Sequence, residues 1–211
     1  MSENNTSLYL RLIKEYNIEY YFYVLLTQNT GINNPYHNNF HTITVLVNSY
    51  KISKLEGLSK EQTRPILIAA IFHDFNHSGG VKEDSENINV AISAFKNYSK
   101  ESNEDNKLII EIIRATQYPY VIKIEDLTIE QKIICDADLT QFYADNYLQQ
   151  IIYGLLMSEQ KMDLKKALDV QQHFLDRVQP LTKYGNQLYD KFMQKRMHDN
   201  STLFDLIKYY G

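Results

Sequence analysis

Apolar residues recur three and four positions apart along most of this chain, the spacing that gathers them on one face of an α-helix. Between Tyr36 and Leu55, for example, Ile43, Leu46, Val47 and Tyr50 follow this spacing. The 7 Gly and 4 Pro among 211 residues supply few turn signals. The predicted helices span Ser7–Thr27, Tyr36–Leu55, Ser59 to the HDFNHSGG segment, Glu83–Asn97, Lys107–Thr116, Thr128–Asp145, Tyr147–Ser158, Leu164–Val178 and Tyr184–Met197. We find no internal repeat or domain boundary, and expect an all-α fold in one compact multi-helix domain over residues 1–211.

The helix predicted to begin at Ser59 is apolar almost all round. Ser59 and Gln62 resemble a capping box, and Pro65 falls in the first turns, where a missing N–H costs little. The run ILIAAIF follows directly. A helix without a polar face is buried, so we predict that this one lies at the centre of the domain and ends at the paired glycines of HDFNHSGG.

Composition and charge narrow the classes of partner. A formal net charge of −4 and a pI near 5.9 argue against a protein that binds long nucleic acids through their phosphates. A small anionic substrate remains compatible, because metal ions would add positive charge that a residue count misses. Cys135 is the single cysteine, the first residues lack the pattern of a signal peptide, and the longest apolar run is too short to span a bilayer. We therefore expect a cytoplasmic protein with no membrane partner.

Two histidines lie four residues apart in the segment YHNNFH. On a helix, His37 and His41 would share one face, one turn apart. Such a pair has two explanations: an exposed polar face that happens to carry histidines, or two ligands of a metal ion. The spacing alone does not choose between them.

His73 and Asp74 form a sharper signal, because they follow the most apolar helix of the chain. An ionised carboxylate in such surroundings needs a positive partner, and a metal ion is a common one. Adjacent helical residues point about 100° apart, so both can reach one ion only at the end of the helix. His77 lies one turn further on and could join the site. The alternative is a helix-terminal Asp beside a hydrogen-bonded His.

A third segment, Asp136-Ala137-Asp138, follows apolar residues and places carboxylates inside a helix that otherwise faces the core. Such a pair alone usually belongs to a solvated face. Together with the histidine pairs, it predicts a site for one or two divalent metal ions, with Zn, Mn, Fe and Mg as candidates. The sequence leaves open whether Asp136 or Asp138 is the ligand.

The order YHNNFH, HDFNH and DADLT resembles the HD superfamily of metal-dependent phosphohydrolases. More narrowly, it resembles the catalytic domain of class I 3′,5′-cyclic nucleotide phosphodiesterases, which carries Y-H-N-x-x-H, H-D-x-x-H and A-D-L-[ST] motifs. A later segment, with Gln171, then Phe174, then Pro180-Leu181, is similar to the purine-binding segment of that family. The motifs extend over about residues 36–181.

The resemblance implies a role for each matched residue. Four residues would hold the first metal ion: His41, His73, Asp74 and Asp138. The catalytic residues would be His37, which would protonate the departing sugar oxygen, and His77, which would lie beside a second ion bridged by Asp74. Tyr36 and Gln171 would bind the substrate, and Phe174 would stack on its base.

The chain departs from the phosphodiesterase pattern at several positions. Thr44 and Asn76 stand where that family has Asp, Ser78 stands where it has Pro, and Thr116-Gln117 stands where it has Thr-Asp. The chain is also shorter than a complete phosphodiesterase catalytic domain. In length, and in a helix start such as Ser85-Glu86-Asn87, it resembles compact bacterial HD phosphohydrolases.

These patterns predict a metal-dependent phosphohydrolase that cleaves the phosphodiester of a small, cyclic nucleotide, with metal-activated water and a histidine acid. Two rival expectations use the same residues: a nucleoside mono- or triphosphate phosphohydrolase, and an inactive nucleotide-binding HD module. The expected partner is a small nucleotide or phosphoester, and the oligomeric state is left open.

Overall fold

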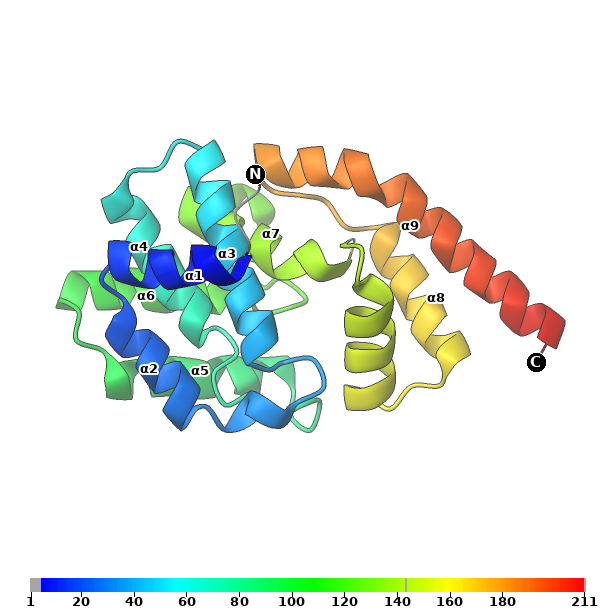
Figure 1. Cartoon of the computed structure of the whole chain (residues 1–211), viewed down its shortest axis with the longest axis horizontal. Coiled ribbons are helices and arrows are strands. Elements are labelled where there is room, and N and C mark those ends of the chain that lie inside the picture. The colour runs from blue at the N-terminus through cyan, green and yellow to red at the C-terminus, as the bar shows by residue number, and fades with distance from the viewer. Residues whose placement is uncertain (1–4, 143, 211) are drawn as a thin grey trace.

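The computed structural model describes residues 5–142 and 144–210, and this part of the chain folds into helices joined by loops (Figure 1). This described part contains no strand, so the predicted all-α fold is confirmed. In chain order the elements are α1 (Asn5–Glu15), α2 (Glu19–Gln28), η1 (Thr30–Asn33), α3 (Asn39–Leu55), α4 (Lys60–Phe72), α5 (Asp84–Tyr98), α6 (Asn103–Ala115), η2 (Ile124–Asp126), α7 (Ile129–Leu139), η3 (Thr140–Phe142), the π-helix η4 (Leu148–Glu159), α8 (Leu164–Leu175) and α9 (Lys183–Tyr210).

Asn17 divides the segment predicted as one helix over residues 7–27 into α1 and α2. Its backbone has a φ of 53°, in the left-handed region, which Asn adopts more readily than most residues. The N–H of Ile18 then donates to the carbonyl of Ile13, and the Ile18 side chain is fully buried. The prediction of one helix was wrong because the apolar spacing continues across this corner.

α4 lies at the centre of the larger core, as its apolar sequence predicts. Every residue from Ile66 to Phe72 is at most 1% exposed, and α3, α6 and α7 pack around the helix. The predicted capping box is present, with Ser59 and Gln62 each accepting the other's backbone N–H. The helix ends at Phe72 rather than at the paired glycines, because Asn76 turns the chain with a φ of 60°.

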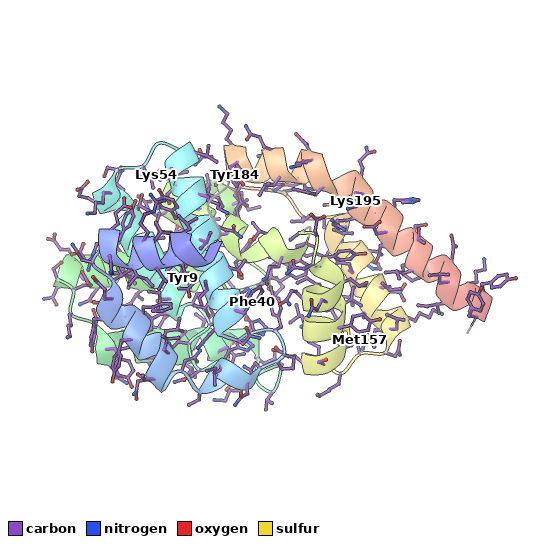
Figure 2. All side chains as sticks on the ribbon, viewed as in Figure 1. Tyr9, Phe40, Lys54, Met157, Tyr184 and Lys195 are labelled. Carbon is purple, nitrogen blue, oxygen red and sulfur yellow. The ribbon has the colours of Figure 1, made fainter. Side chains whose placement is uncertain are left out.

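A second apolar cluster joins η4, α8 and α9, to the right of α7 in Figure 1. Ile151 and Ile152 of η4 pack with Leu168 of α8, and Phe204 of α9 covers them. Side chains fill the space between these three helices (Figure 2). The C-terminal elements therefore form a wall of their own, packed beside the helices that surround α4.

α9 continues to Tyr210, well beyond the predicted end at Met197. The residues HDNST after Met197 are of types that disfavour a helix interior. Tertiary contacts outweigh this preference, since Asn200 is fully buried and its Nδ2 donates to the carbonyl of Leu168 and to Gln172 Oε1. Among the described residues, no helix is both long enough and apolar enough to cross a membrane.

Two further boundaries differ from the prediction. The segment SKESNEDN, predicted as a loop, is helical from Asn103, because Ser102 caps α6 by accepting from the N–H of Asp105. α7 ends at Leu139 rather than near Asp145, and the tighter turn of η3 follows at once. This early end keeps Asp138 in the last turn of α7, beside α3 and α4.

Candidate metal centre

The start of α3 separates His37 from His41. The Asn38 side chain accepts hydrogen bonds from the N–H groups of Phe40 and His41, which caps the helix. His41 therefore lies in the first turn, whereas His37 precedes the helix. The prediction that both share one helix face was wrong, because the cap falls between them. The turn nevertheless brings the two ring centroids to 5.9 Å.

The end of α4 presents His73 and Asp74 together, as their position after an apolar helix predicts. His73 is the C-cap, and Asp74 is the next residue. Side-chain amides hold the turn behind them: Asn29 Oδ1 accepts from the N–H of Asn76, and Asn76 Oδ1 accepts from the N–H of Thr30. The segment around η1 thus anchors the turn that follows α4.

The two acids of α7 have different partners. Asp136 is 3% exposed and accepts hydrogen bonds from the N–H groups of Leu181 and Thr182, which fixes the segment leading into α9. Asp138 instead lies with Oδ1 at 3.0 Å from Nε2 of His41. The choice that the sequence left open is thereby decided, and Asp138 is the candidate ligand.

Ligand atoms of four residues converge where α3, α4 and α7 meet. These four, which we call the four-residue cluster, are His41, His73, Asp74 and Asp138, and their ligand atoms all lie within 4.8 Å of one another. Nε2 of His41 lies 3.1 Å from Asp74 Oδ2 and 3.2 Å from Nε2 of His73. The four residues could hold one metal ion, as the sequence predicts.

Both histidines of the four-residue cluster are held from behind by acceptors. Nδ1 of His41 lies 2.9 Å from Gln141 Oε1, and Nδ1 of His73 lies 2.8 Å from the carbonyl oxygen of Ala70. A carbonyl oxygen only accepts, so each Nδ1 carries a hydrogen, and once Nε2 releases its own hydrogen the lone pair of that atom faces the cluster. Histidines that bind metal ions are held in this way.

Charge balance gives a second reason to expect a cation. Burial lowers the pKa of His41, but hydrogen bonds to Asp138 and Asp74 outweigh it and raise that pKa to about 9. Burial raises the pKa of Asp138, but hydrogen bonds from His41 and His73 outweigh it and lower that pKa to about 2. The pKa of His73 is likewise raised and that of Asp74 lowered. Two imidazolium charges thus balance two carboxylates, and one divalent cation would supply the same charge.

A second histidine pair borders the four-residue cluster. The rings of His37 and His77 stack with their centroids 3.6 Å apart and their planes 25° apart. Nδ1 of His37 lies 2.6 Å from Glu159 Oε2, whereas Nδ1 of His77 accepts from the N–H of Gly79 at 3.1 Å. His37, Asp74 and His77 offer ligand atoms within 4.8 Å of one another, so these three could hold a second ion.

The hydrogen bond from Gly79 decides what the His77 ring can do. With Nδ1 as the acceptor, the neutral ring carries its hydrogen on Nε2, which then donates and does not coordinate a metal. Burial and the charge of His37 lower the pKa of His77 to about 4, so the ring is neutral near pH 7. His77 is therefore better suited to donate to a substrate oxygen than to hold an ion.

Glu159, the last residue of η4, fixes His37 in place. Its side chain is fully buried, and Oε1 accepts from the N–H groups of Tyr36 and His37 while Oε2 binds the His37 ring. Burial raises the pKa of Glu159, but the hydrogen bonds from His37 lower it by more. The carboxylate orients the His37 ring.

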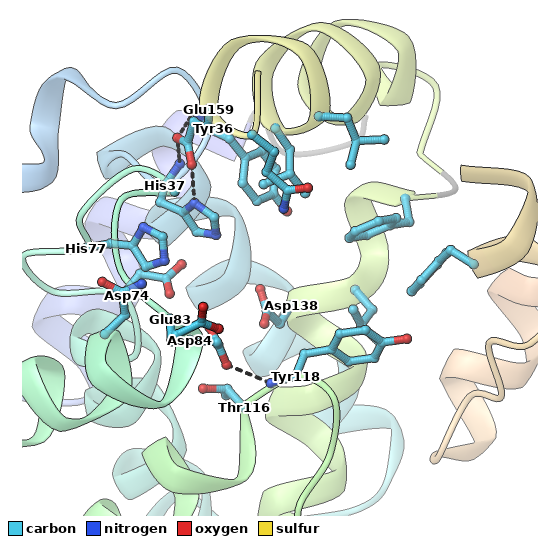
Figure 3. A pocket seen from close by; sticks show the side chains of 18 of the residues that line it. Tyr36, His37, Asp74, His77, Glu83, Asp84, Thr116, Tyr118, Asp138 and Glu159 are labelled. Atoms are coloured by element: carbon cyan, nitrogen blue, oxygen red, sulfur yellow. Dashed lines mark hydrogen bonds and ion pairs between the residues drawn. The ribbon is translucent and has the colours of Figure 1, made fainter. Parts of the chain in front are cut away.

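These groups open onto one cavity of about 630 Å³, within the range of small-molecule sites (Figure 3). Six of the predicted site residues line it: Tyr36, His37, Asp74, His77, Asp138 and Phe174. His41 and His73 lie behind this wall, each 1% exposed. A metal ion held by the four-residue cluster would therefore contact a molecule in the cavity from the side of Asp74 and Asp138.

Gln171 does not line this cavity, although the resemblance implies a role for it at the substrate base. It is fully buried, and its Nε2 donates to the carbonyl of Phe142, which joins α8 to η3. Phe174 does line the cavity, and its ring stacks on that of Phe142 with centroids 4.0 Å apart. Gln171 therefore lies in the core, whereas Phe174 lies on the cavity wall.

Sequence reasoning missed Gln141 and Glu159. Gln141 follows Asp138 by three residues, and a buried amide so close to a candidate ligand is a signal that could have been followed. Glu159 is a lone acid at the end of an apolar helix, and it reaches His37 across 122 positions of sequence. Only the fold reveals that pairing.

Comparison with known proteins adds nothing to this geometry: no protein-family model matches the chain, and no curated protein matches its sequence. The functional argument therefore rests on the residues of the cavity.

Proposed function

We propose that this chain is a metal-dependent phosphohydrolase that cleaves the phosphodiester of a small nucleotide. The observation that carries the proposal is the position of the four-residue cluster beside the His37–Glu159 pair, with Asp74 and Asp138 of the cluster facing the same cavity as His37. The motif order, which resembles the HD superfamily, supports the same reaction class. A cyclic nucleotide is the first substrate to test.

The ion would be held by the four-residue cluster: His41, His73, Asp74 and Asp138. When bound, a divalent ion lowers the pKa of water and neutralises negative charge on a phosphoryl group. The chain itself supplies a rigid setting, because Gln141 and the Ala70 carbonyl fix both imidazoles. Zn, Mn and Fe suit a set of two imidazoles and two carboxylates, and Mg suits the carboxylates.

His37 is the proposed general acid. Its Nδ1 is bound to Glu159, which leaves Nε2 for the cavity. A protonated ring held in this way can give its Nε2 hydrogen to the oxygen that departs from phosphorus. The departing sugar oxygen of a phosphodiester is a poor leaving group without that proton. Phosphodiester cleavage is therefore the reaction for which the His37–Glu159 pair is best suited.

His77 and Tyr36 have supporting roles in this proposal. The Nε2–H of His77 donates to a phosphoryl oxygen and orients it. The Tyr36 ring is 3% exposed and packs against the rings of His37 and His41, with centroids 4.7 and 4.6 Å away. Tyr36 thereby keeps the acid and the metal-binding ring at a fixed separation.

A substrate panel tests the proposal. Purified protein is loaded in turn with Mn, Mg and Zn and assayed on 3′,5′-cyclic nucleotides, linear phosphodiesters and nucleoside mono- and triphosphates. We expect diesters to be hydrolysed, and a chelator to abolish that activity. Hydrolysis of mono- or triphosphates alone would overturn the diester assignment. Bound metal without hydrolysis of any phosphoester would point instead to a nucleotide-binding module.

A further inference from the structure

The cavity has a second wall that the proposed reaction does not use. α8 contributes Val170, His173 and Phe174 to this wall, and the turn after α8 contributes Arg177. The spacing of these residues places them on one helix face. The backbone continues to turn through Arg177, because the N–H groups of Arg177 and Val178 both donate to the Phe174 carbonyl. We call this surface the α8 wall.

The α8 wall contributes no acidic side chain to the cavity, whereas five acidic side chains line the rest of it beside Lys82, His37 and His77. The acidic lining residues all lie on other elements: Asp74, Glu83, Asp84, Asp138 and Glu159. His173 and Arg177 are the ionisable residues of the α8 wall, and both are exposed. Their side chains therefore face the cavity and solvent rather than the protein core.

Arg177 is available to a ligand. Within the described residues it forms no ion pair, whereas Arg64 binds Glu101 and Arg196 binds Asp145. A guanidinium presents a planar fork of N–H donors that matches the oxygens of a phosphate. His173 lies one turn earlier, and its Nδ1 is 2.7 Å from the Asp169 carbonyl oxygen, which leaves Nε2 free for the cavity.

Aromatic rings also line the cavity. Phe142 stacks on Phe174, and the Tyr118 ring lies 6.3 Å from Phe174. A base or sugar resting against these rings, with its scissile phosphate at the four-residue cluster, would direct its remaining substituent toward the α8 wall. The chemistry of that wall selects an anionic substituent.

We infer that His173 and Arg177 form a subsite for a second phosphate group of the substrate, beyond the phosphodiester that is cleaved. This inference rests on the proposed function and narrows it. Among small nucleotides, it favours those that carry an additional phosphate over a cyclic mononucleotide, which has only one.

Two chromogenic esters that differ by one phosphate test the subsite: thymidine 5′-(p-nitrophenyl phosphate) and the same ester with a 3′-phosphate. With Mn²⁺, wild-type kcat/KM should be at least about tenfold higher for the 3′-phosphorylated ester, the scale of one charge-assisted hydrogen bond. Arg177→Gln should bring this ratio close to one. Arg114→Gln, which removes an exposed arginine outside the cavity lining, should keep the wild-type ratio. A wild-type ratio near one, or an equal fall in Arg114→Gln, overturns the inference.

Equilibrium binding separates this inference from the proposed function. Calorimetry with Mn²⁺ compares thymidine 3′,5′-bisphosphate with thymidine 5′-monophosphate. If neither ester is hydrolysed, a preference for the bisphosphate that Arg177→Gln abolishes keeps the subsite while the proposed function fails. If both esters are hydrolysed with equal efficiency, the proposed function stands and the subsite fails. Equal affinity for the two nucleotides also overturns the subsite.

Discussion

The two histidine pairs of this protein lie side by side and are built for different chemistry. In the inner pair, His41 and His73 are almost fully buried, and both Nδ1 atoms face carbonyl acceptors while both Nε2 atoms converge on carboxylates. In the outer pair, His37 and His77 line the cavity, and one Nδ1 faces Glu159 while the other accepts from a backbone N–H.

This difference shows that the partner of Nδ1 decides the use of a histidine. An acceptor behind the ring directs a lone pair forward, toward a cation. A donor behind the ring directs an N–H forward, toward an anion, and a carboxylate behind it holds Nδ1 and leaves Nε2 facing the cavity. The inner pair is thus suited to hold a metal ion, and the outer pair to handle protons and phosphate oxygens.

The largest expected effect comes from breaking the inner pair. His73→Asn should lower the affinity for Mn²⁺ by more than about hundredfold and abolish hydrolysis. This loss is larger than the one expected when a residue that only hydrogen-bonds to a metal ligand is replaced. His77→Asn should retain the ion, since His77 belongs to the outer pair. Calorimetric titration of both variants measures this. If His77→Asn releases the metal as completely as His73→Asn does, the distinction between the pairs is wrong.

Breaking the outer pair should affect proton transfer and leave metal binding intact. His37→Gln is expected to lower kcat by about 10²–10⁴-fold for a cyclic nucleotide, whose leaving oxygen needs a proton. The loss should be much smaller for a p-nitrophenyl ester, because p-nitrophenolate departs unprotonated. Steady-state kinetics on both substrates, with metal content as a control, checks this. Equal losses on the two would show that His37 is not the acid.

Gln141 offers a milder test of the inner pair. Gln141→Met removes the acceptor of His41 Nδ1 and should weaken metal affinity by about 10–100-fold. Gln171→Met is a matched control, because Gln171 is equally buried and contacts η3 without touching a candidate ligand. Affinity should fall in the first variant alone. A similar fall in both would assign Gln141 a packing role only.

The smallest expected step is the change in the metal affinity of the inner pair for each pH unit. The pKa of His41 is raised from 6.5 to about 9, so this group stabilises the metal-free fold fully below about pH 6.5, and that contribution is lost as pH rises through about 9. A metal ion must displace the proton of His41, and this displacement alone should raise the metal affinity up to about tenfold per pH unit in this window. Calorimetry in buffers of different ionisation enthalpy measures the protons released. Binding without proton release would contradict the charge balance described for the cluster.

Local patterns in the sequence were sufficient to predict much of the fold and the residues of the inner pair. The capping box at Ser59, the buried α4 and the position of His73 and Asp74 at its end all follow from residues close together in the chain. The break at Asn17 and the length of α9 do not, since a left-handed residue and a buried Asn200 depend on tertiary contacts.

The outer pair depends far more on the fold. His37 receives its partner from the end of η4, and its place before α3 reflects a cap that the i, i+4 spacing does not reveal. Gln171 fits the spacing of the phosphodiesterase purine-binding segment, yet its side chain lies in the core and donates to the Phe142 carbonyl. Residues that act through distant partners are thus the ones that sequence patterns assign least well.

The central claim is that the four-residue cluster holds a divalent metal ion, and elemental analysis tests it most directly. Wild-type protein is compared with Asp74→Ala and with Asp84→Ala, a carboxylate that lines the cavity outside the cluster. We predict metal in the wild type and in Asp84→Ala, and its loss in Asp74→Ala. Full metal content in Asp74→Ala, or no metal in the wild type after incubation with Mn, Zn or Fe, would contradict the claim.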